Sequence, residues 1–376
     1  MAAAFVAAMG LGTAGVAQAI PVQPHPVPTW QTNGRVNAIV VSGNVAYLGG
    51  QFTSMRPPGA AAGTGEVTRN HAAAVSLTTG ALLPWNPNAN GTVRALRVVG
   101  TTVYMGGAFT QVGGATHTRV AAVQATGAGA VISAFKASAS GEVFSVVASG
   151  NSLFLGGGFG TVDGVAQPNM AAVDTVSGAI LPWAPAVNGQ VRAIRLLGFP
   201  RMVIGGSFTT INGSSANHIG AIDGDTGNSL PWRDHTTYNV IGLASDANGV
   251  YVAGAGGGGN FAAFNPATGA QNWLGGTNGN VQAISVVGGE VYVGGHFHVY
   301  CGPQRGQHTC TAPIARDKLL AVDEGTGNLT SWAPGANSVL GVFALYGVAS
   351  NGDVLAGGDF TSIGLRKQQG YAQFTP

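Results

Sequence analysis

The ionisable side chains of this sequence are few, and they do not form a pattern typical of a catalytic site. The 376 residues include 14 acidic residues, and 8% of all residues are charged. Hydrolysis of a glycoside needs two carboxylates about 5–9.5 Å apart across a cleft. The acids left over as loose candidates are Glu66, Asp163, Asp234 and Asp359. No nucleophile elbow, zinc-binding helix motif or phosphate-binding loop stands in a suitable context, so we expect no catalytic residue, metal or cofactor.

Three aspartates open short turns of the Thr-Gly type, namely Asp174, Asp223 and Asp323. An aspartate at this position accepts backbone N–H groups and stabilises the turn. Calcium binding is the alternative for Asp223 and Asp323, but the ligand series of a calcium loop does not follow either residue. We therefore interpret these carboxylates as turn-forming groups.

Two cysteines, Cys301 and Cys310, lie nine positions apart in a polar stretch. This spacing predicts a small disulfide ring if the protein is exported. A zinc site is the alternative, because His296, His298 and His308 lie nearby. The spacing itself is not a zinc pattern, so we favour the disulfide.

Seven polar residues recur at one position, just before short runs rich in alanine and valine. They are His71, Arg119, Asn169, His218, Asn260, Lys318 and Gln369. A ring of such hydrogen-bond donors suits a neutral or mildly anionic ligand, such as a glycan. The alternative is structural, since strands that begin at solvent need polar groups to satisfy loose backbone atoms. Both interpretations stay open from sequence.

Arginine recurs at a second position, directly after the valine that begins another apolar run. Arg94 and Arg192 occupy it, and the other copies carry Asn37, Phe144, Ile241, Gln282 and Phe343. If these runs surround a channel, the two arginines place positive charge near its mouth. Hydrogen bonding between neighbouring strands is the alternative, because guanidinium groups often bridge strands.

The elements that position these residues form a repeat. An apolar strand, a short turn and a second strand ending in Gly-Gly occur in copies that begin at Val36, Val93, Val143, Val191, Val240, Val281 and Val342. An Ala/Val strand, a turn and a strand ending near tryptophan follow each copy. Four short strands in about 50 residues match one blade of a propeller. We therefore predict an all-β, seven-bladed β-propeller.

The tryptophans and the chain ends extend this prediction. All six tryptophans, Trp30 among them, occupy the same position in the repeat. We expect each tryptophan to pack over the Gly-Gly step of the next blade. The last copy stops at its third strand, while Val27–Trp30 resembles a fourth strand without a blade. Joining these segments would close the ring and remove two exposed sheet edges.

The first residues predict export. Residues 5–16 are small and apolar, and Ala17-Gln18-Ala19 resembles a signal-peptidase site, although no basic residue precedes the apolar stretch. We expect a signal peptide over residues 1–19, which is incomplete at its N-terminus if the true start lies upstream. One propeller domain over residues 20–376 would follow, secreted and without a membrane span. The net charge of +2 gives no basic footprint for nucleic acid.

The connections between the second and third strands differ in length more than any others. The longest cover Ser54–Asn70 and Val299–Asp317. In a propeller these loops share one rim with the links between blades. Long loops on a rigid scaffold are the usual place for a binding site, so we expect the ligand on this rim.

The sequence resembles a known group at two places. The Gly-Gly-x-Phe-Thr step followed by Ala-Val-Asp-x-x-Thr-Gly resembles bacterial secreted propellers built from delta-60-type repeats. Residues Phe264–Trp273 resemble the tryptophan-docking motif of quinoprotein dehydrogenases. The first resemblance implies surface or secreted recognition without assigned chemistry. The second implies pyrroloquinoline quinone and calcium, usually with eight or six blades.

The leading hypothesis is a secreted, non-enzymatic binding module. Its partner would be a surface glycan or an extracellular protein, bound as a monomer or as a subunit of a larger assembly. One alternative is a propeller enzyme, a quinone-dependent oxidoreductase or a hydrolase or lyase, with its site at the channel mouth. The other is a structural domain of a cell-surface assembly.

Overall fold

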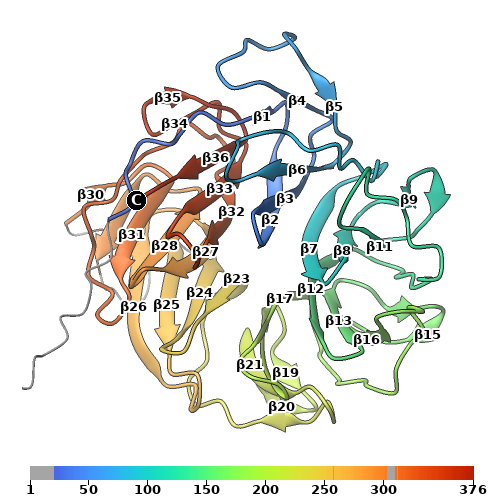
Figure 1. Ribbon diagram of the computed structural model, residues 1–376. Coiled ribbons are helices and arrows are strands. Elements are labelled where there is room, and N and C mark those ends of the chain that lie inside the picture. Colours follow the sequence, from blue (N-terminus) through green and yellow to red (C-terminus); the bar gives the residue numbers. More distant parts are fainter. Residues whose placement is uncertain (1–20, 257, 303–309, 311) are drawn as a thin grey trace, which may run out of the picture.

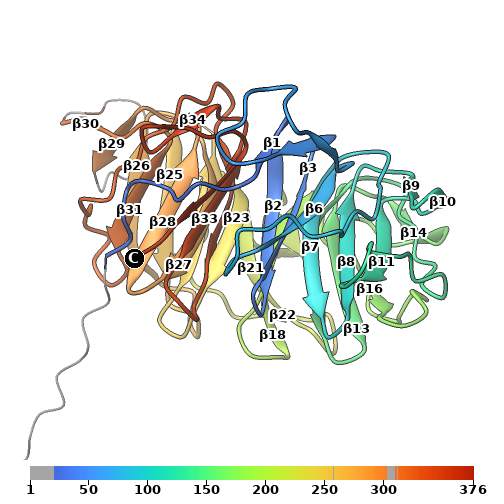
Figure 2. The same cartoon turned by 45° about the horizontal axis from the view of Figure 1, so that its top comes forward.

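The computed structural model describes residues 21–256, 258–302, 310 and 312–376. Throughout this part the regular structure is β-strand, arranged in separate antiparallel sheets side by side around a central axis (Figure 1). Turning the molecule shows the strands running between two rims (Figure 2). The described residues contain no helix that has the length and apolarity to cross a membrane.

Each repeat contributes three strands to one sheet. The inner strands are β2 (Val36–Ser42), β7 (Val93–Val99), β12 (Val143–Ser149), β17 (Val191–Leu196), β23 (Asn239–Ser245), β27 (Val281–Val287) and β32 (Val342–Gly347). The second strands are β3 (Val45–Gly50), β8 (Thr102–Gly107), β13 (Ser152–Gly157), β18 (Arg201–Gly206), β24 (Val250–Ala255), β28 (Glu290–Gly295) and β33 (Val354–Gly358). The third strands are β6 (Ala72–Ser76), β11 (Val120–Gln124), β16 (Met170–Asp174), β21 (Ile219–Asp223), β25 (Gly259–Phe264), β31 (Leu319–Asp323) and β36 (Tyr371–Phe374).

The outer, fourth strand is shorter than the repeat pattern predicts. It is a full strand in β26 (Gln271–Thr277) and two residues long in β22 (Ser229–Leu230). In four other repeats the outer segment makes a single bridge to the third strand, as between Val75 and Leu82. The outer segment carries proline next to tryptophan, and proline cannot donate a hydrogen bond to the ladder. The inner three strands therefore carry the sheet.

The connections between the second and third strands contain short pairs of strands, which lie at the outside of the ring of sheets (Figure 1). The first connection carries β4 (Ser54–Arg56) and β5 (Val67–Thr68), and β1 (Gln31–Thr32) joins β4. The others are β9 (Gln111–Val112) with β10 (Ala115–Thr116), β14 (Thr161–Val162) with β15 (Val165–Ala166), β19 (Thr210–Ile211) with β20 (Ser214–Ser215), β29 (Val299–Gly302) with β30 (Ile314–Ala315), and β34 (Ser362–Ile363) with β35 (Arg366–Lys367).

Every inner strand has a register shift at the residue that follows its first valine. In the first repeat Val36 pairs with Gly50 and Ala38 pairs with Gly49, so Asn37 has no partner across the ladder. The same shift recurs in the other six inner strands. A bulge of this kind leaves one residue unpaired and redirects its side chain. The bulged residues occupy the position that Arg94 and Arg192 hold.

The two glycines of the Gly-Gly step have different roles. A Cβ atom on Gly49 would lie 2.6 Å from Cγ1 of Val93, in the inner strand of the next repeat. A Cβ atom on Gly50 would collide with the carbonyl oxygen of Arg35, in its own bulge. The first glycine therefore allows close packing between sheets, and the second allows the bulge.

The expected docking of tryptophan over the Gly-Gly step is wrong. Trp85 instead lies against Gly129, in the turn after the third strand of the next repeat, and its Nε1 donates to the carbonyl of Gln124 at 2.8 Å. Gly129 has a φ of 76° and no side chain, which leaves room for the indole ring. The Gly-Gly step is already filled by valine, so the tryptophan packs farther from the axis.

The two ends of the described chain meet in one sheet region. Val27 bridges Gln373, and the backbone N–H of Gln23 donates to the carbonyl of Thr375 at 2.8 Å. A Cβ atom on Gly357 of β33 would lie 2.6 Å from Cγ1 of Val36 in β2. The last and first repeats therefore make the same glycine–valine contact as Gly49 and Val93.

Cys301 and Cys310 form a disulfide, which confirms the predicted pairing. The bond fits an extracellular protein, because such bridges persist in oxidising compartments. Both sulfurs are thereby occupied, which removes them from the alternative zinc site. His308 and the expected signal peptide lie outside the described residues.

Candidate functional site

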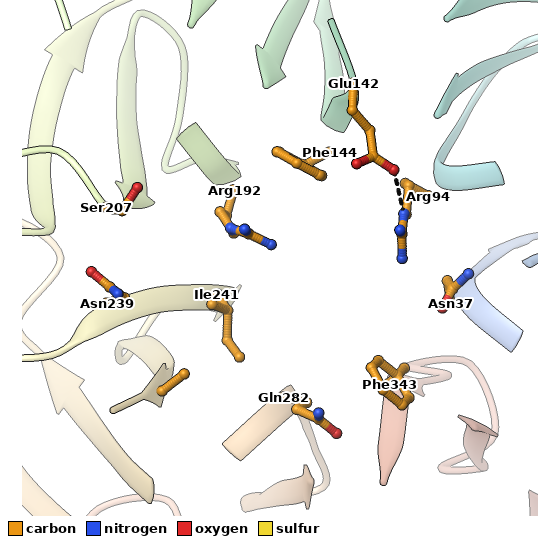
Figure 3. A pocket seen from close by; sticks show the side chains of 11 residues that line it. Asn37, Arg94, Glu142, Phe144, Arg192, Ser207, Asn239, Ile241, Gln282 and Phe343 are labelled. Atoms are coloured by element: carbon orange, nitrogen blue, oxygen red, sulfur yellow. Dashed lines mark hydrogen bonds and ion pairs between the residues drawn. The ribbon is translucent and has the colours of Figure 1, made fainter. Parts of the chain in front are cut away.

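The bulged residues of the inner strands surround a central cavity of about 520 Å³ (Figure 3). They are Asn37, Arg94, Phe144, Arg192, Ile241, Gln282 and Phe343. Each lies at the start of an inner strand, opposite the end of the second strand. The cavity therefore opens on the rim that carries the strand-two to strand-three connections. The sequence-based placement of Arg94 and Arg192 near the channel mouth agrees with this geometry.

Arg94 is already paired inside the cavity. Its Nε lies 2.7 Å from Oε1 of Glu142, and the two side chains are about one-third exposed. Glu142 is the single acidic side chain that lines the cavity. Figure 3 shows the pair on one wall of the opening. Glu142 therefore neutralises Arg94, and the interaction joins two neighbouring sheets, as the alternative interpretation of these arginines expected.

Arg192 has no carboxylate partner in the described part of the chain, where the ion pairs involve other residues. Its Nη2 donates to Oε1 of Gln190 at 3.0 Å, and its guanidinium carbon lies 4.5 Å from the ring centre of Phe144. Burial lowers the pKa of Arg192, and the charge of Glu142 opposes that shift. Arginine remains charged at any physiological pH. Arg192 thus gives the cavity a positive charge that no carboxylate contacts, on a side chain that lies over the ring of Phe144.

Two amide side chains at the cavity wall have unused hydrogen-bonding capacity. Both polar atoms of Asn37 and the Oε1 of Gln282 are buried without a partner among the described residues. A buried polar atom without a partner lowers stability by about 1–3 kcal/mol. Ser207 and Asn239 add a hydroxyl and a further amide, whereas Ile241 and Phe343 add apolar surface. A ligand with several hydrogen-bonding groups could pair with the side chains of Ser207 and Asn239, which line the cavity.

The seven polar residues that precede the third strands form a column, here called the polar column. Most of them take up an unusual backbone conformation at the start of the strand. Five of its members have left-handed backbone conformations, with φ between 63° and 69°: His71, Arg119, Asn169, His218 and Lys318. The N–H of His71 donates to the carbonyl of Phe52 at 2.8 Å, and its own carbonyl accepts from Gly50. Histidine and asparagine tolerate this conformation better than most residues. These contacts agree with the structural interpretation.

The column members do not line the central cavity. Nδ1 of His71 contacts the carbonyl of Gly50 at 3.1 Å, and Nδ2 of Asn169 donates to the carbonyl of Val187 at 3.0 Å. The Nε of Arg119 is buried without a partner among the described residues. Burial also lowers the pKa of His218. The expected ring of ligand-binding donors is therefore not assembled around one cavity.

Two members of the column differ from the rest. Gln369 lies one residue before the equivalent position, which is Gly370 with a φ of 74°. Its Oε1 accepts from Nη2 of Arg56 at 2.7 Å, which links the last repeat to the first rim loop. Asn260 lies inside β25 and pairs with Gly254. Neither residue repeats the geometry of His71.

Lys318 is buried beside a second hollow of about 410 Å³, between the sixth and seventh repeats. Its Nζ lies 3.1 Å from Nε2 of His298, whose Nδ1 lies 2.8 Å from Oδ1 of Asp317. Because the carboxylate requires a proton on Nδ1, Nε2 accepts from the ammonium group. Burial lowers the pKa of Lys318, while Asp317 and Asp359 oppose that shift. The ammonium group of Lys318 therefore already has a hydrogen-bond partner in its own repeat, His298.

The turn aspartates behave as expected. Oδ1 of Asp223 accepts from the backbone N–H groups of Asp225 and Thr226 at 2.9 and 2.8 Å. These bonds favour the ionised form, and the N–H of Thr226 is the largest cause of the lowered pKa of Asp223. Asp174 has a lowered pKa for the same kind of reason, with Ser177 as donor. The carboxylates thus stabilise the turns of the third strands.

Sequence reasoning missed Glu142, Ser207 and Asn239. A signal was present, because the residue before each inner strand's valine is polar in most copies. These residues are Arg35, Thr92, Glu142, Gln190, Asn239 and Asn280. Their position next to the bulge brings several of them to the cavity or to its arginines.

The cavity does not fit the calcium ion that one resemblance implies together with a quinone. Calcium binds six to eight oxygen ligands, most of them carboxylate or carbonyl groups. The cavity offers one carboxylate, Glu142, which is already paired with Arg94. Elsewhere in the described residues, no group of three or more His, Cys, Asp or Glu side chains is placed to hold a metal ion.

Comparison with known proteins shows the fold. No protein-family model and no curated protein sequence matches the chain. The WD40 β-propeller domain of Doa1 is similar at 11% identity and a TM-score of 0.57, over 93% of this chain and 96% of that domain. The computationally designed protein Ika8 is similar at 16% identity and a TM-score of 0.56, over 94% of this chain and 99% of that protein. The chain therefore has a β-propeller fold.

Proposed function

We propose that this protein is a secreted, non-enzymatic binding module that holds an anionic ligand in its central cavity. The observation that carries the proposal is the charge of that cavity, where Arg94 and Arg192 face one carboxylate. A guanidinium without a carboxylate partner, on the wall of a cavity open to solvent, is a favourable site for an anion. The ligand belongs to an extracellular glycan or protein.

The proposed scaffold is a closed ring of seven blades of the delta-60 type. The contact between Gly357 and Val36, and the bridge between Val27 and Gln373, support closure between the last and first repeats. Closure would hold the seven bulged residues at fixed positions around the axis. A rigid ring loses little conformational entropy on binding, which favours affinity.

Secretion is supported by the apolar leader followed by Ala17-Gln18-Ala19 and by the disulfide between Cys301 and Cys310. The long loops of the same rim, which carry β4, β5, β29 and β30, would extend the contact with a large ligand beyond the cavity. The binding site would then have a small charged centre and a broad outer rim.

A glycan array that contains neutral, carboxylated and sulfated glycans tests the proposal. We expect the purified protein, residues 20–376, to bind acidic members and Arg192→Ala to lose that binding with an unchanged melting temperature. Arg201→Ala is the matched control, because Arg201 donates to the carbonyl of Pro266 outside the cavity. Equal binding by Arg192→Ala and the parent protein, or no binding of any anion, would refute the central site.

A further inference from the structure

We infer that the ligand of the central cavity is a sugar that carries a carboxylate, and that this carboxylate binds Arg192. The inference rests on the proposed function, because it names the class of ligand for the same cavity. Arg192 is preferred over Arg94 because Glu142 already occupies Nε of Arg94 at 2.7 Å. A ligand carboxylate at Arg94 would lie beside Glu142, whereas no carboxylate contacts Arg192 among the described residues.

The Arg192 site has the features that bind a carboxylate. The guanidinium of Arg192 lies over the ring of Phe144, 4.5 Å from its centre, and Gln190 accepts from Nη2 on one side. The remaining N–H groups form a flat fork, which matches the two oxygens of a carboxylate. A phosphate or sulfate has oxygens in three dimensions and is better served by several cations. Among the residues that line this cavity, Arg192 is the one guanidinium without a carboxylate contact.

The rest of the wall selects a sugar over an acidic peptide. The hydroxyl of Ser207 and the amides of Asn239 and Gln282 line the cavity and supply donors and acceptors. Sugar hydroxyls donate and accept, so one ring can satisfy both kinds of atom. The side chains of Ile241 and Phe343 supply apolar surface for the C–H face of the ring. An aspartate or glutamate side chain would satisfy Arg192 alone and leave the amides unpartnered.

The size of the cavity agrees with this ligand. Its volume of about 520 Å³ lies in the range of small-molecule sites. Figure 3 shows Arg192, Asn37, Gln282 and Phe343 on different walls of the same opening. A single ring with substituents can therefore contact guanidinium, amide and apolar groups together. This arrangement assigns the carboxylate to Arg192 and the hydroxyls to the amides.

Isothermal titration calorimetry with two matched sugars tests the inference. We expect methyl β-D-glucuronide to bind and methyl β-D-glucoside to bind at least about tenfold more weakly, because it lacks the charge. Arg192→Lys keeps the charge and removes the planar fork, and should weaken glucuronide binding about tenfold. The matched control is Arg201→Lys, where Nε of Arg201 donates to the carbonyl of Pro266 at 3.0 Å, outside the cavity. That control should bind as the parent does.

Further titrations separate failure of the inference from failure of the proposed function. Binding of N-acetylglutamate as tight as that of the glucuronide would overturn the sugar, and preferred binding of glucose 6-sulfate would overturn the carboxylate. Either result would leave an anion site in the cavity. If Arg192→Lys bound the glucuronide as the parent does, the assignment to Arg192 would be wrong. If glucuronide, sulfate ester and acetylglutamate all failed to bind, both proposals would fail.

Discussion

Two sets of repeated residues lie at the same rim, and they have different structural roles. The column of bulged residues, which includes Arg94 and Arg192, lines the central cavity. The column that includes His71 and His218 precedes the third strands and holds left-handed backbone. Both columns recur in successive repeats, and the bulged column is polar in four of its seven copies. Polarity and repetition therefore do not identify a binding site in a repeat protein, whereas the direction imposed by the backbone does.

The difference has a physical origin in the hydrogen-bond ladder. At the inner strand a bulge removes the second residue from pairing, as with Arg192 between Val191 and Ala193. Its side chain is then free to point at the axis. Before the third strand the backbone of His218 bonds to Phe208 and Gly206. At that position the main-chain conformation explains why a residue such as histidine is found, and no ligand is needed to explain it.

The largest expected effect comes from removing the space that permits a bulge. In Gly206→Ala the new Cβ would collide with the carbonyl oxygen of Gln190. Backbone has little freedom to move there, so we expect about 3 kcal/mol of destabilisation, measured by denaturant unfolding. Binding at Arg192 should weaken as well, because Gln190 and Arg192 flank the same bulge.

Gly325→Ala is the matched control for this substitution. The nearest atom to a Cβ on Gly325 is Oδ1 of Asp323 at 3.7 Å, an ordinary contact. It should change stability by less than about 1 kcal/mol. If Gly206→Ala were as stable as this control, the bulge would not depend on glycine and the contrast between the columns would lose its cause.

An intermediate effect is expected at the left-handed column. His71→Val places a β-branched residue at a φ of 63° and should cost about 1–2 kcal/mol, measured by the same unfolding assay. His71→Asn should be close to neutral, because asparagine tolerates that conformation. Neither variant should change the dissociation constant of a ligand in the central cavity. A loss of binding in His71→Asn at unchanged stability would show that this column takes part in binding.

Much of the fold, and part of the site, is readable from sequence. The repeat phrase places the strands, and the valine that starts each inner strand places Arg94 and Arg192 near the axis. Gly370 in the last repeat indicates that residues at the position of His71 have a left-handed backbone. This signal can be used only once the last repeat has been aligned correctly with the others. The role of Glu142 could not be predicted from sequence, because it depends on the distance to Arg94 in a neighbouring sheet. The tryptophan contact fails for a similar reason, because sequence spacing does not say which glycine of the next repeat is free.

The smallest expected change in stability is at the cavity itself, in Glu142→Gln. The Arg94–Glu142 pair is about one-third exposed, and such pairs contribute about 0–1 kcal/mol to stability. The melting temperature should therefore move little. Affinity for an anion should rise about fivefold, or about 1 kcal/mol, because a competing negative charge is gone and Arg94 becomes available. Titration of the variant with methyl β-D-glucuronide at low and high salt measures the gain, which should shrink as salt screens the charges. An unchanged or lower affinity at low salt would mean that Glu142 does not compete with the ligand, and that the charge of the inner column is no guide to what it binds.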